Sequence, residues 1–268
     1  MTKADVESRI TRADFKKSNM VQMLNASQTG DLTVSHSIFQ ISPKDKSRNL
    51  AECKFNTVSQ WAFKHFAEVY ECHDAHEAIS FYRQISTSPR AASLWGHVFE
   101  AKVLNHIDVC GCNFGIRRLS PQGPGTVPWT CGGPIPRFTF LQGEDFVHGL
   151  TKAIEDGKDS LHLVPSVPNF KAVDSILYTR GDVLTLIQCT ISEEHPIRVA
   201  GLTTLRNWLK TDILKSLRPS KVMPWRFIFV VPPSQASNFK KQTLVGKEEG
   251  HWASWVQQHV LGLNIFKE

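Results

Sequence analysis

The stretch NFKAVDSILYTRGDVLTLIQCTIS, residues 169–192, decides the fold that we expect for this chain. It contains two apolar runs, AVDSILY and DVLTLIQCTI, which are joined at the turn Arg180-Gly181-Asp182. Both runs are apolar at successive positions, and such continuous runs are typical of central strands that are covered on both faces. The stretch therefore predicts a hairpin of two buried strands in the middle of a sheet.

The short turn also predicts which residues of the two strands face each other. If pairing is symmetric about Gly181, residues equally far from it in the sequence lie opposite one another, which brings Asp174 opposite Gln188. Directly opposed side chains point to the same face, with Cβ atoms about 5 Å apart. Thr190 follows two residues later on that face. The hairpin therefore predicts a polar group inside an apolar strand pair.

Two interpretations of Asp174 follow from its surroundings. An ionised carboxylate in such a strand is costly unless it is paired or coordinates a metal, and two oxygen ligands from neighbouring strands suit Mg²⁺, which keeps several waters. Alternatively, Asp174 caps the end of the strand near Asn169 and Lys171 and is partly solvated. The residues alone leave both interpretations open.

The second half of the chain continues with elements that predict an α/β fold. A helix is expected at 200–217, and WRFIFVVP (225–232) is expected as another central strand that ends at two prolines. A strand-helix-strand crossover between 182 and 232 predicts a parallel pair inside a mixed sheet. HWASWVQQHVLGL (251–263) is expected to close the chain as an amphipathic helix. The apolar face of the helix at 200–217 comprises Leu202, Leu205, Leu209, Ile213 and Leu217.

The first half is expected to place helices before the sheet. Residues 1–50 mix charged residues with short apolar pieces and predict a partly ordered arm. Apolar residues at helical spacing predict helices at 58–71 and 73–85, which together form a helical hairpin. The tract PQGPGTVPWTCGGPIPR (121–137) is expected to be a loop between two short strands, because it is rich in proline and glycine.

A domain boundary is predicted at the helix break before the core. Ser88 and Pro89 are good residues for the start of a helix, so a long buried helix is expected over 88–107. We therefore expect an N-terminal arm with a helical hairpin at 1–86 and a core domain at 87–268. The expected fold class is α/β, a mixed central sheet flanked by helices.

Composition limits the class of protein further. The chain has 268 residues, of which 41% are hydrophobic, so a sizeable core can be buried. A net charge of +6 favours acidic partners such as nucleic acid. The N-terminus has no secretory signal, and no stretch approaches the ~20 apolar residues of a membrane span. We therefore expect a soluble intracellular protein without a membrane partner.

The six cysteines are too sparse for a disulfide framework. Cys110, Cys112 and Cys131 could join His106 in a zinc site, although the one-residue spacing between the first two is shorter than usual. The alternative is free thiols in and around the core.

The hairpin and its neighbours resemble the PD-(D/E)XK nuclease superfamily. An Asp before a turn, a second strand that ends in an acid or amide followed two residues later by Lys, and then a helix form its motif. The run AVDSILYTRGDVLTLIQCTISEEHPI, with GLTTLRNWL, FIFVVP and QHVLGL, looks more specifically like the nuclease-like domain of crinkler and retrotransposon-hot-spot type effectors. The resemblance covers residues 88–263 and implies a restriction-endonuclease-like fold.

The resemblance also implies a set of site residues. Glu100, Asp174 and Gln188 match the positions that hold Mg²⁺ or Mn²⁺ in the family. Thr190 stands where the family has Lys. Either a cation from the following helix replaces it, with Arg198, Arg206 and Lys210 as candidates, or the fold is kept for binding without cleavage. The implied reaction is metal-dependent hydrolysis of a DNA phosphodiester, in which the metal activates a bound water and a basic residue stabilises the transition state.

Three functions remain open at this stage. The first is an effector nuclease that acts on DNA in a host nucleus as a virulence factor. The second is a non-catalytic module of the same fold that binds nucleic acid or a host nuclear protein, which Thr190 supports. The third is an interaction protein whose Asp174 is structural. The residues expected to contact DNA are Arg117, Arg118, Arg198, Arg206 and Lys210.

Other chemical candidates each have a plainer alternative. His195 could act as a proton shuttle or could simply lie in a turn. His73 and His76 have the spacing of a helical metal pair but lack further ligands nearby. Trp129 and Trp225 could stack on bases or belong to the core. The chain has no GxxxxGK[S/T], GxSxG or HExxH motif. The residues do not predict an oligomeric state.

Overall fold

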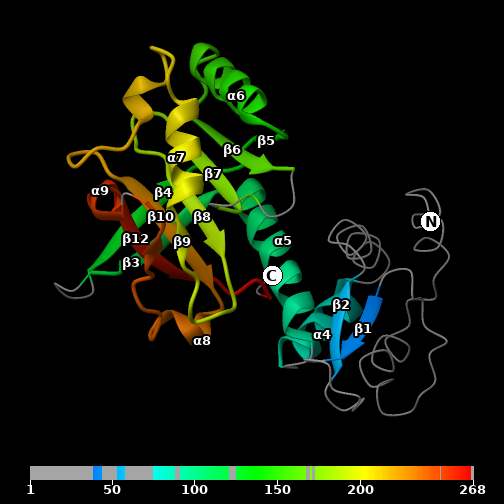
Figure 1. Ribbon diagram of the computed structural model, residues 1–268. Helices are drawn as coiled ribbons and strands as arrows, with labels where there is room; N and C mark the ends of the chain where they lie inside the picture. The colour runs from blue at the N-terminus through cyan, green and yellow to red at the C-terminus, as the bar shows by residue number, and fades with distance from the viewer. Residues whose placement is uncertain are drawn as a thin grey trace. The chain divides into compact units, whose positions relative to one another are not determined.

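The computed structural model describes residues 39–43, 53–57, 75–87, 91–120, 125–166, 170, 173–247 and 249–266 (Figure 1). The chain divides into two compact units, Met1–Ala101 with Glu268, and Lys102–Lys267. The division falls inside helix α5 (Ala92–Cys110). The predicted boundary near residue 87 stays a prediction.

The described residues of the N-terminal unit form a small sheet, helix α4 and the start of α5. Strand β1 (Phe39–Pro43) pairs antiparallel with β2 (Cys53–Thr57), within and just after the segment expected to be a partly ordered arm. Helix α4 (Ala75–Ser86) and the start of α5 confirm the helices predicted at 73–85 and 88–107. The helix predicted at 58–71 and the Ser88-Pro89 break lie outside the described residues.

In the C-terminal unit, the described residues build one mixed sheet of eight strands, in the order β4-β3-β12-β10-β8-β7-β6-β5. Strands β6, β7 and β8 form an antiparallel meander, whereas β8, β10 and β12 run parallel to one another. The mixed α/β fold and the predicted parallel pair are thus confirmed. The strands are β3 (Cys112–Arg118), β4 (Thr126–Cys131), β5 (Arg137–Phe140), β6 (Ser160–Pro165), β7 (Ser175–Thr179), β8 (Thr185–Cys189), β10 (Trp225–Val231) and β12 (Val256–Gly262).

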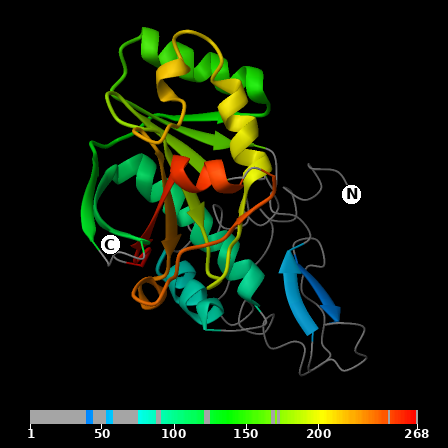
Figure 2. The ribbon, with the colours of Figure 1, turned by 60° about the vertical axis from the view of Figure 1, so that its left-hand side comes forward.

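Helices α6 (Gly143–Glu155) and α7 (Val199–Trp208) cover the same face of this sheet and lie side by side (Figure 2). Their apolar residues, such as Phe146 and Leu205, join one core with the side chains of that face. From α6 to β10 the order of major elements is therefore helix, three antiparallel strands, helix and strand. No helix among the described residues is long and apolar enough to cross a membrane.

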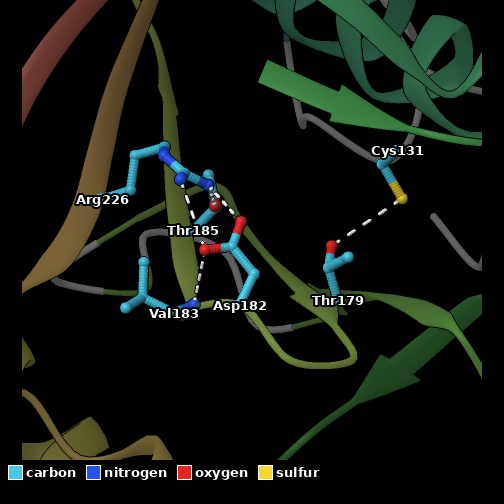
Figure 3. A network of polar contacts seen from close by, with 6 residues as sticks. All are labelled: Cys131, Thr179, Asp182, Val183, Thr185 and Arg226. Atoms are coloured by element: carbon cyan, nitrogen blue, oxygen red, sulfur yellow. Dashed lines mark hydrogen bonds and ion pairs between the residues drawn. The ribbon is translucent and has the colours of Figure 1, made fainter. Parts of the chain in front are cut away.

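The hairpin has the register predicted from its turn. Ile176 pairs with Leu186 and Leu177 with Thr185, so paired residues are equally far from Gly181 in the sequence. Gly181 has a φ of 77°, which only glycine adopts readily. Beside this turn, Asp182 accepts hydrogen bonds from Arg226 Nη1 (2.8 Å) and from a backbone N–H, and Arg226 also donates to Thr185 (Figure 3). These contacts join the hairpin to β10.

The closing helix predicted at 251–263 is wrong in its second half. Helix α9 ends at Trp255, and β12 then runs through the centre of the sheet. β12 pairs in parallel with β10 and antiparallel with β3, so both of its edges and both of its faces are covered. A strand that is buried on both faces shows no alternation of apolar and polar residues, and the spacing of Trp252, Val256 and Val260 also fits a helix.

The loop predicted at 121–137 contains a strand. Residues Thr126–Cys131 form β4, which pairs with β3 at the edge of the sheet. Pro128 lacks a backbone N–H, but an edge strand tolerates proline because one of its sides makes no ladder hydrogen bonds. The strands predicted on either side of the tract, β3 and β5, are confirmed.

The helix predicted at 200–217 is shorter than expected. α7 ends at Trp208, and turns followed by a short 3₁₀ helix (Lys215–Leu217) replace its second half. The Thr211 carbonyl accepts bonds from the N–H groups of Leu214 and Lys215, so the chain turns tightly there. Leu214 is buried as a result, whereas Ile213, which we expected on the buried face, is 37% exposed.

Candidate nucleic-acid interface

The predicted polar group lies at one edge of the sheet, which we call the carboxyl edge. It comprises the C-terminal ends of β8, β10 and β12, the start of the antiparallel β7, and the connections 190–198 and 232–247. Ligands of open α/β sheets bind outside the carboxyl ends of parallel strands. The topology therefore makes this edge the first place to look for a site.

Asp174 and Gln188 meet at the carboxyl edge, as their positions about Gly181 predict. Gln188 Nε2 donates to Asp174 Oδ2 over 2.7 Å, and the backbone N–H of Cys189 donates to the same oxygen over 2.7 Å. The backbone N–H of Asp174 in turn donates to the Ile187 carbonyl. Asp174 is half-buried and Gln188 is buried. The carboxylate thus joins β7 to the end of β8.

The orientation of the Gln188 amide does not favour the expected magnesium site, which stays a prediction. Gln188 presents its amide nitrogen to the carboxylate, and an N–H group is a hydrogen-bond donor and no ligand for a hard cation. Within the described part of the chain, no group of three or more His, Cys, Asp or Glu side chains is placed to hold a metal ion. The contacts favour the other interpretation, in which Asp174 caps the strand end.

Glu100 and Thr190 complete the set implied by the resemblance. Glu100 lies in α5 within the N-terminal unit and is half-buried, and its part in a site stays a prediction. Thr190 is buried, and its hydroxyl accepts the backbone N–H of Ser192 over 3.0 Å. At the position where the family has a lysine, this chain therefore has a short side chain that is used in a local turn.

His195 lies in the connection after β8 and is held there by its backbone. Its N–H donates to Gln242 Oε1 over 2.7 Å, and its ring packs edge-on against Phe229. Burial, and then the charge of Arg198, hold the pKa of His195 below the ordinary value. A neutral imidazole fits both interpretations of His195, whereas the bond from its backbone N–H to Gln242 agrees with a turn residue.

Two glutamines that the sequence analysis did not single out tie the carboxyl edge together. The backbone N–H of Gln242 donates to Gln258 Oε1 (2.8 Å), and Gln258 Nε2 donates back to the Gln242 carbonyl (2.9 Å). Gln242 Nε2 also donates to the Glu193 carbonyl. The connections after β8 and β10 are thus fixed to β12. In the sequence, the amide side chain of Gln258 inside the apolar run WVQQHVLGL could have indicated this contact.

The cations predicted to contact DNA differ in what they contact. Arg117 Nη2 donates to the carbonyls of Ala236 (2.6 Å) and Phe239, so its guanidinium has a structural role. Arg206 lies 4.8 Å from the centre of the Trp255 ring. The remaining predicted cations, which are Arg118, Arg198 and Lys210, are exposed on β3, β9 and the turn after α7, respectively.

Arg198 has basic neighbours that the sequence analysis missed. It belongs to β9 (Ile197–Arg198), which pairs in parallel with β11 (Leu244–Val245). Lys240 and Lys241 precede β11, and Lys247 follows it; all three are exposed, as is Arg198. In the sequence, the adjacent lysines in NFKKQ were the indication of this basic group. The fold thus gathers four exposed cations at the carboxyl edge, where Glu193 and Glu194 are the exposed acids of the described connections.

The plainer alternatives hold for several of the other candidates. Trp129 and Trp225 are buried, and Trp225 Nε1 donates to the Leu217 carbonyl, so both belong to the core. Cys110, Cys112 and Cys131 are free thiols. The His106 ring packs 5.8 Å from that of Phe114. His73 and the side chain of His76 lie outside the described residues.

No known protein family, no curated protein and no solved structure matches this chain.

The contacts of Asp174 predict the effect of replacing it. We expect Asp174→Asn to lower the free energy of unfolding by about 1–3 kcal/mol, because two buried donors lose a charged acceptor. Mg²⁺ should leave the melting temperature of both proteins unchanged. The control is Asp212→Asn, whose side chain is 95% exposed and should matter little. If Mg²⁺ stabilised the wild type but not Asp174→Asn, Asp174 would be a metal ligand.

Proposed function

We propose that the chain is a DNA-binding module of the restriction-endonuclease type, which binds through the carboxyl edge and does not cleave. The order of α6, β6, β7, β8, α7 and β10 supports the family likeness, because helix, three-stranded meander, helix and strand form the core of that superfamily. In this match the first helix is α6, and not α5, which carries Glu100. Asp174 before β7 and Gln188 near the end of β8 also agree with the motif.

Binding without cleavage rests on the hydrogen bonds of Asp174. Its Oδ2 accepts two N–H groups, one from Gln188, at the place where a nuclease of this type needs oxygen ligands for a metal. Thr190 stands at the position of the family's lysine, and its hydroxyl accepts the backbone N–H of Ser192. This chain therefore keeps the fold of the motif while its polar residues satisfy each other.

DNA is the ligand whose chemistry best fits the exposed cations. Phosphate contacts by Lys and Arg supply most of the affinity of nucleic-acid binding, and the release of counterions makes that affinity fall with salt. Arg198, Lys240, Lys241 and Lys247 lie together at the carboxyl edge, and the whole chain has a net charge of +6. Under this proposal the chain acts as an effector on DNA in the nucleus of a host cell, as the resemblance implies.

A double charge reversal tests the proposal. We expect Lys240→Glu with Lys241→Glu to weaken binding to a short fluorescent DNA duplex about 10- to 100-fold and to reduce the slope of log affinity against log salt by about 2, because two phosphate contacts are lost. Fluorescence anisotropy at several salt concentrations measures both quantities. The melting temperature of the variant should stay near that of the wild type, since both side chains are exposed.

The matched control reverses two lysines at the opposite edge of the sheet. Lys152 lies in the last turn of α6 and Lys158 in the turn before β6, and both are exposed. Lys152→Glu with Lys158→Glu should keep most of the affinity. Equal losses in the two variants would mean that binding follows net charge alone. A flat salt response would favour a protein partner, and cleavage of DNA with Mg²⁺ or Mn²⁺ would restore the nuclease prediction.

A further inference from the structure

Two cysteines face each other directly across the edge of the sheet. Cys112 begins β3 and Cys131 ends β4, and the antiparallel register pairs these two residues. Opposed residues of antiparallel strands have Cα atoms about 4.5–5.5 Å apart and side chains on the same face. A disulfide needs Cα atoms about 4.4–6.8 Å apart. The backbone therefore already has the spacing that a Cys112–Cys131 disulfide requires.

The surroundings of the two thiols agree with this proximity. Both side chains are buried, and both thiols are free. Burial raises the pKa of Cys112 far above its ordinary value, and Cys131 is close enough to raise it further. The sulfur of Cys131 also accepts a hydrogen bond from Thr179 Oγ1 over 3.8 Å (Figure 3). Protonated thiols react slowly, so the pair stays reduced unless an oxidant persists.

Two glycines allow the backbone before Cys112 to pack closely against the backbone after Cys131. A Cβ atom on Gly133 would lie 2.5 Å from the Cys110 carbonyl carbon, and one on Gly111 would lie 2.6 Å from the Gly133 nitrogen. The segment before Cys112 therefore packs directly on the segment after Cys131. Cys110, in contrast, is exposed at the end of α5. The accessible thiol of Cys110 is thus close in sequence to the buried pair.

We propose that Cys112 and Cys131 form a reversible disulfide that ties the edge strand β4 to β3. The oxidant is a low-molecular-weight disulfide such as oxidised glutathione. One cysteine thiolate attacks it and releases one small thiol, and the second cysteine then displaces the other small thiol. Each cysteine loses one proton, and the two electrons reduce the small disulfide to two thiols. The site is independent of the DNA-binding proposal.

Peptide mapping of the oxidised full chain tests the assignment. After incubation with oxidised glutathione, blocking of free thiols and digestion without reductant, we expect a peptide that joins Cys112 to Cys131 by a bond that removes two hydrogens. Cys110, which only Gly111 separates from Cys112, should carry glutathione on the same peptide. The disulfide should raise the melting temperature by several degrees, because it restricts the unfolded chain, and dithiothreitol should reverse the shift.

Single substitutions separate this pair from the neighbouring thiol. Cys110→Ser should still form the linked peptide, whereas Cys112→Ser and Cys131→Ser should not. Should either buried variant fail to fold, the wild-type map decides alone, because it distinguishes all three cysteines. A disulfide that includes Cys110, or recovery of both Cys112 and Cys131 as blocked free thiols after oxidation, would overturn the proposal.

Discussion

Asp108→Ala should lower the free energy of unfolding by about 3–5 kcal/mol, because it leaves His162 and Arg137 without their acceptor. Asp108 Oδ1 contacts His162 Nδ1 over 2.5 Å, and Asp108 Oδ2 forms an ion pair with Arg137. His162 is fully buried, and its Nε2 has no hydrogen-bond partner among the described residues. Asp108 is therefore the acceptor on which this buried imidazole depends.

Urea unfolding measures the loss. The midpoint should fall while the slope with denaturant stays constant, which indicates a change in stability alone. The control is Asp159→Ala, because the Asp159 side chain is 95% exposed and its ion pair with Arg180 spans 3.7 Å. Exposed pairs of this kind contribute about 0–1 kcal/mol. A loss below about 1 kcal/mol for Asp108→Ala would show that His162 finds another acceptor.

Gly111→Ala is expected to lower the free energy of unfolding by about 2–5 kcal/mol. Gly111 has a φ of 69°, and a left-handed residue with a Cβ costs about 1–2 kcal/mol. The added Cβ would also collide with the Cys131 carbonyl oxygen and lie 2.6 Å from the Gly133 nitrogen. Both are backbone atoms, so they can move only by opening the contact between the segments, at a typical cost of about 1–3 kcal/mol.

Gly181→Ala separates the two causes. Gly181 has a similar φ of 77°, but a Cβ added there would meet nothing within 4 Å. We therefore expect a loss of about 1–2 kcal/mol from conformation alone. Thermal and urea unfolding of both variants give the comparison. Equal losses would mean that backbone conformation, and not the close approach of the two segments, explains the effect at Gly111.

The parts of the fold that local sequence controls could be predicted. The 175–187 hairpin is an example, because its turn fixes the pairing of the residues beside it. The strand β12 could not be predicted, because its place depends on β10 and β3, which lie far away in sequence. Its apolar residues fit a helix and a doubly covered strand equally well. The strand is chosen over the helix because it fills the position between β10 and β3 in the sheet.

The candidate site could be predicted in part for the same reason. The meeting of Asp174 with Gln188 follows from the register of one hairpin. Which end of the Gln188 amide faces the carboxylate does not, because it depends on the full set of donors and acceptors around the pair. Lys240 and Lys241 reach the carboxyl edge only through the long connection after β10, for which the sequence offers no local rule.

The position of β12 also determines the order in which the sheet can assemble. β12 lies between β10 and β3, yet it is the last strand of the sheet in the order of the chain. A ribosome therefore releases β3, and then β10, before the strand that separates them. Until then both have an open edge, and open edges pair readily with other chains. Newly made chains should therefore need protection from aggregation until β12 has been synthesised.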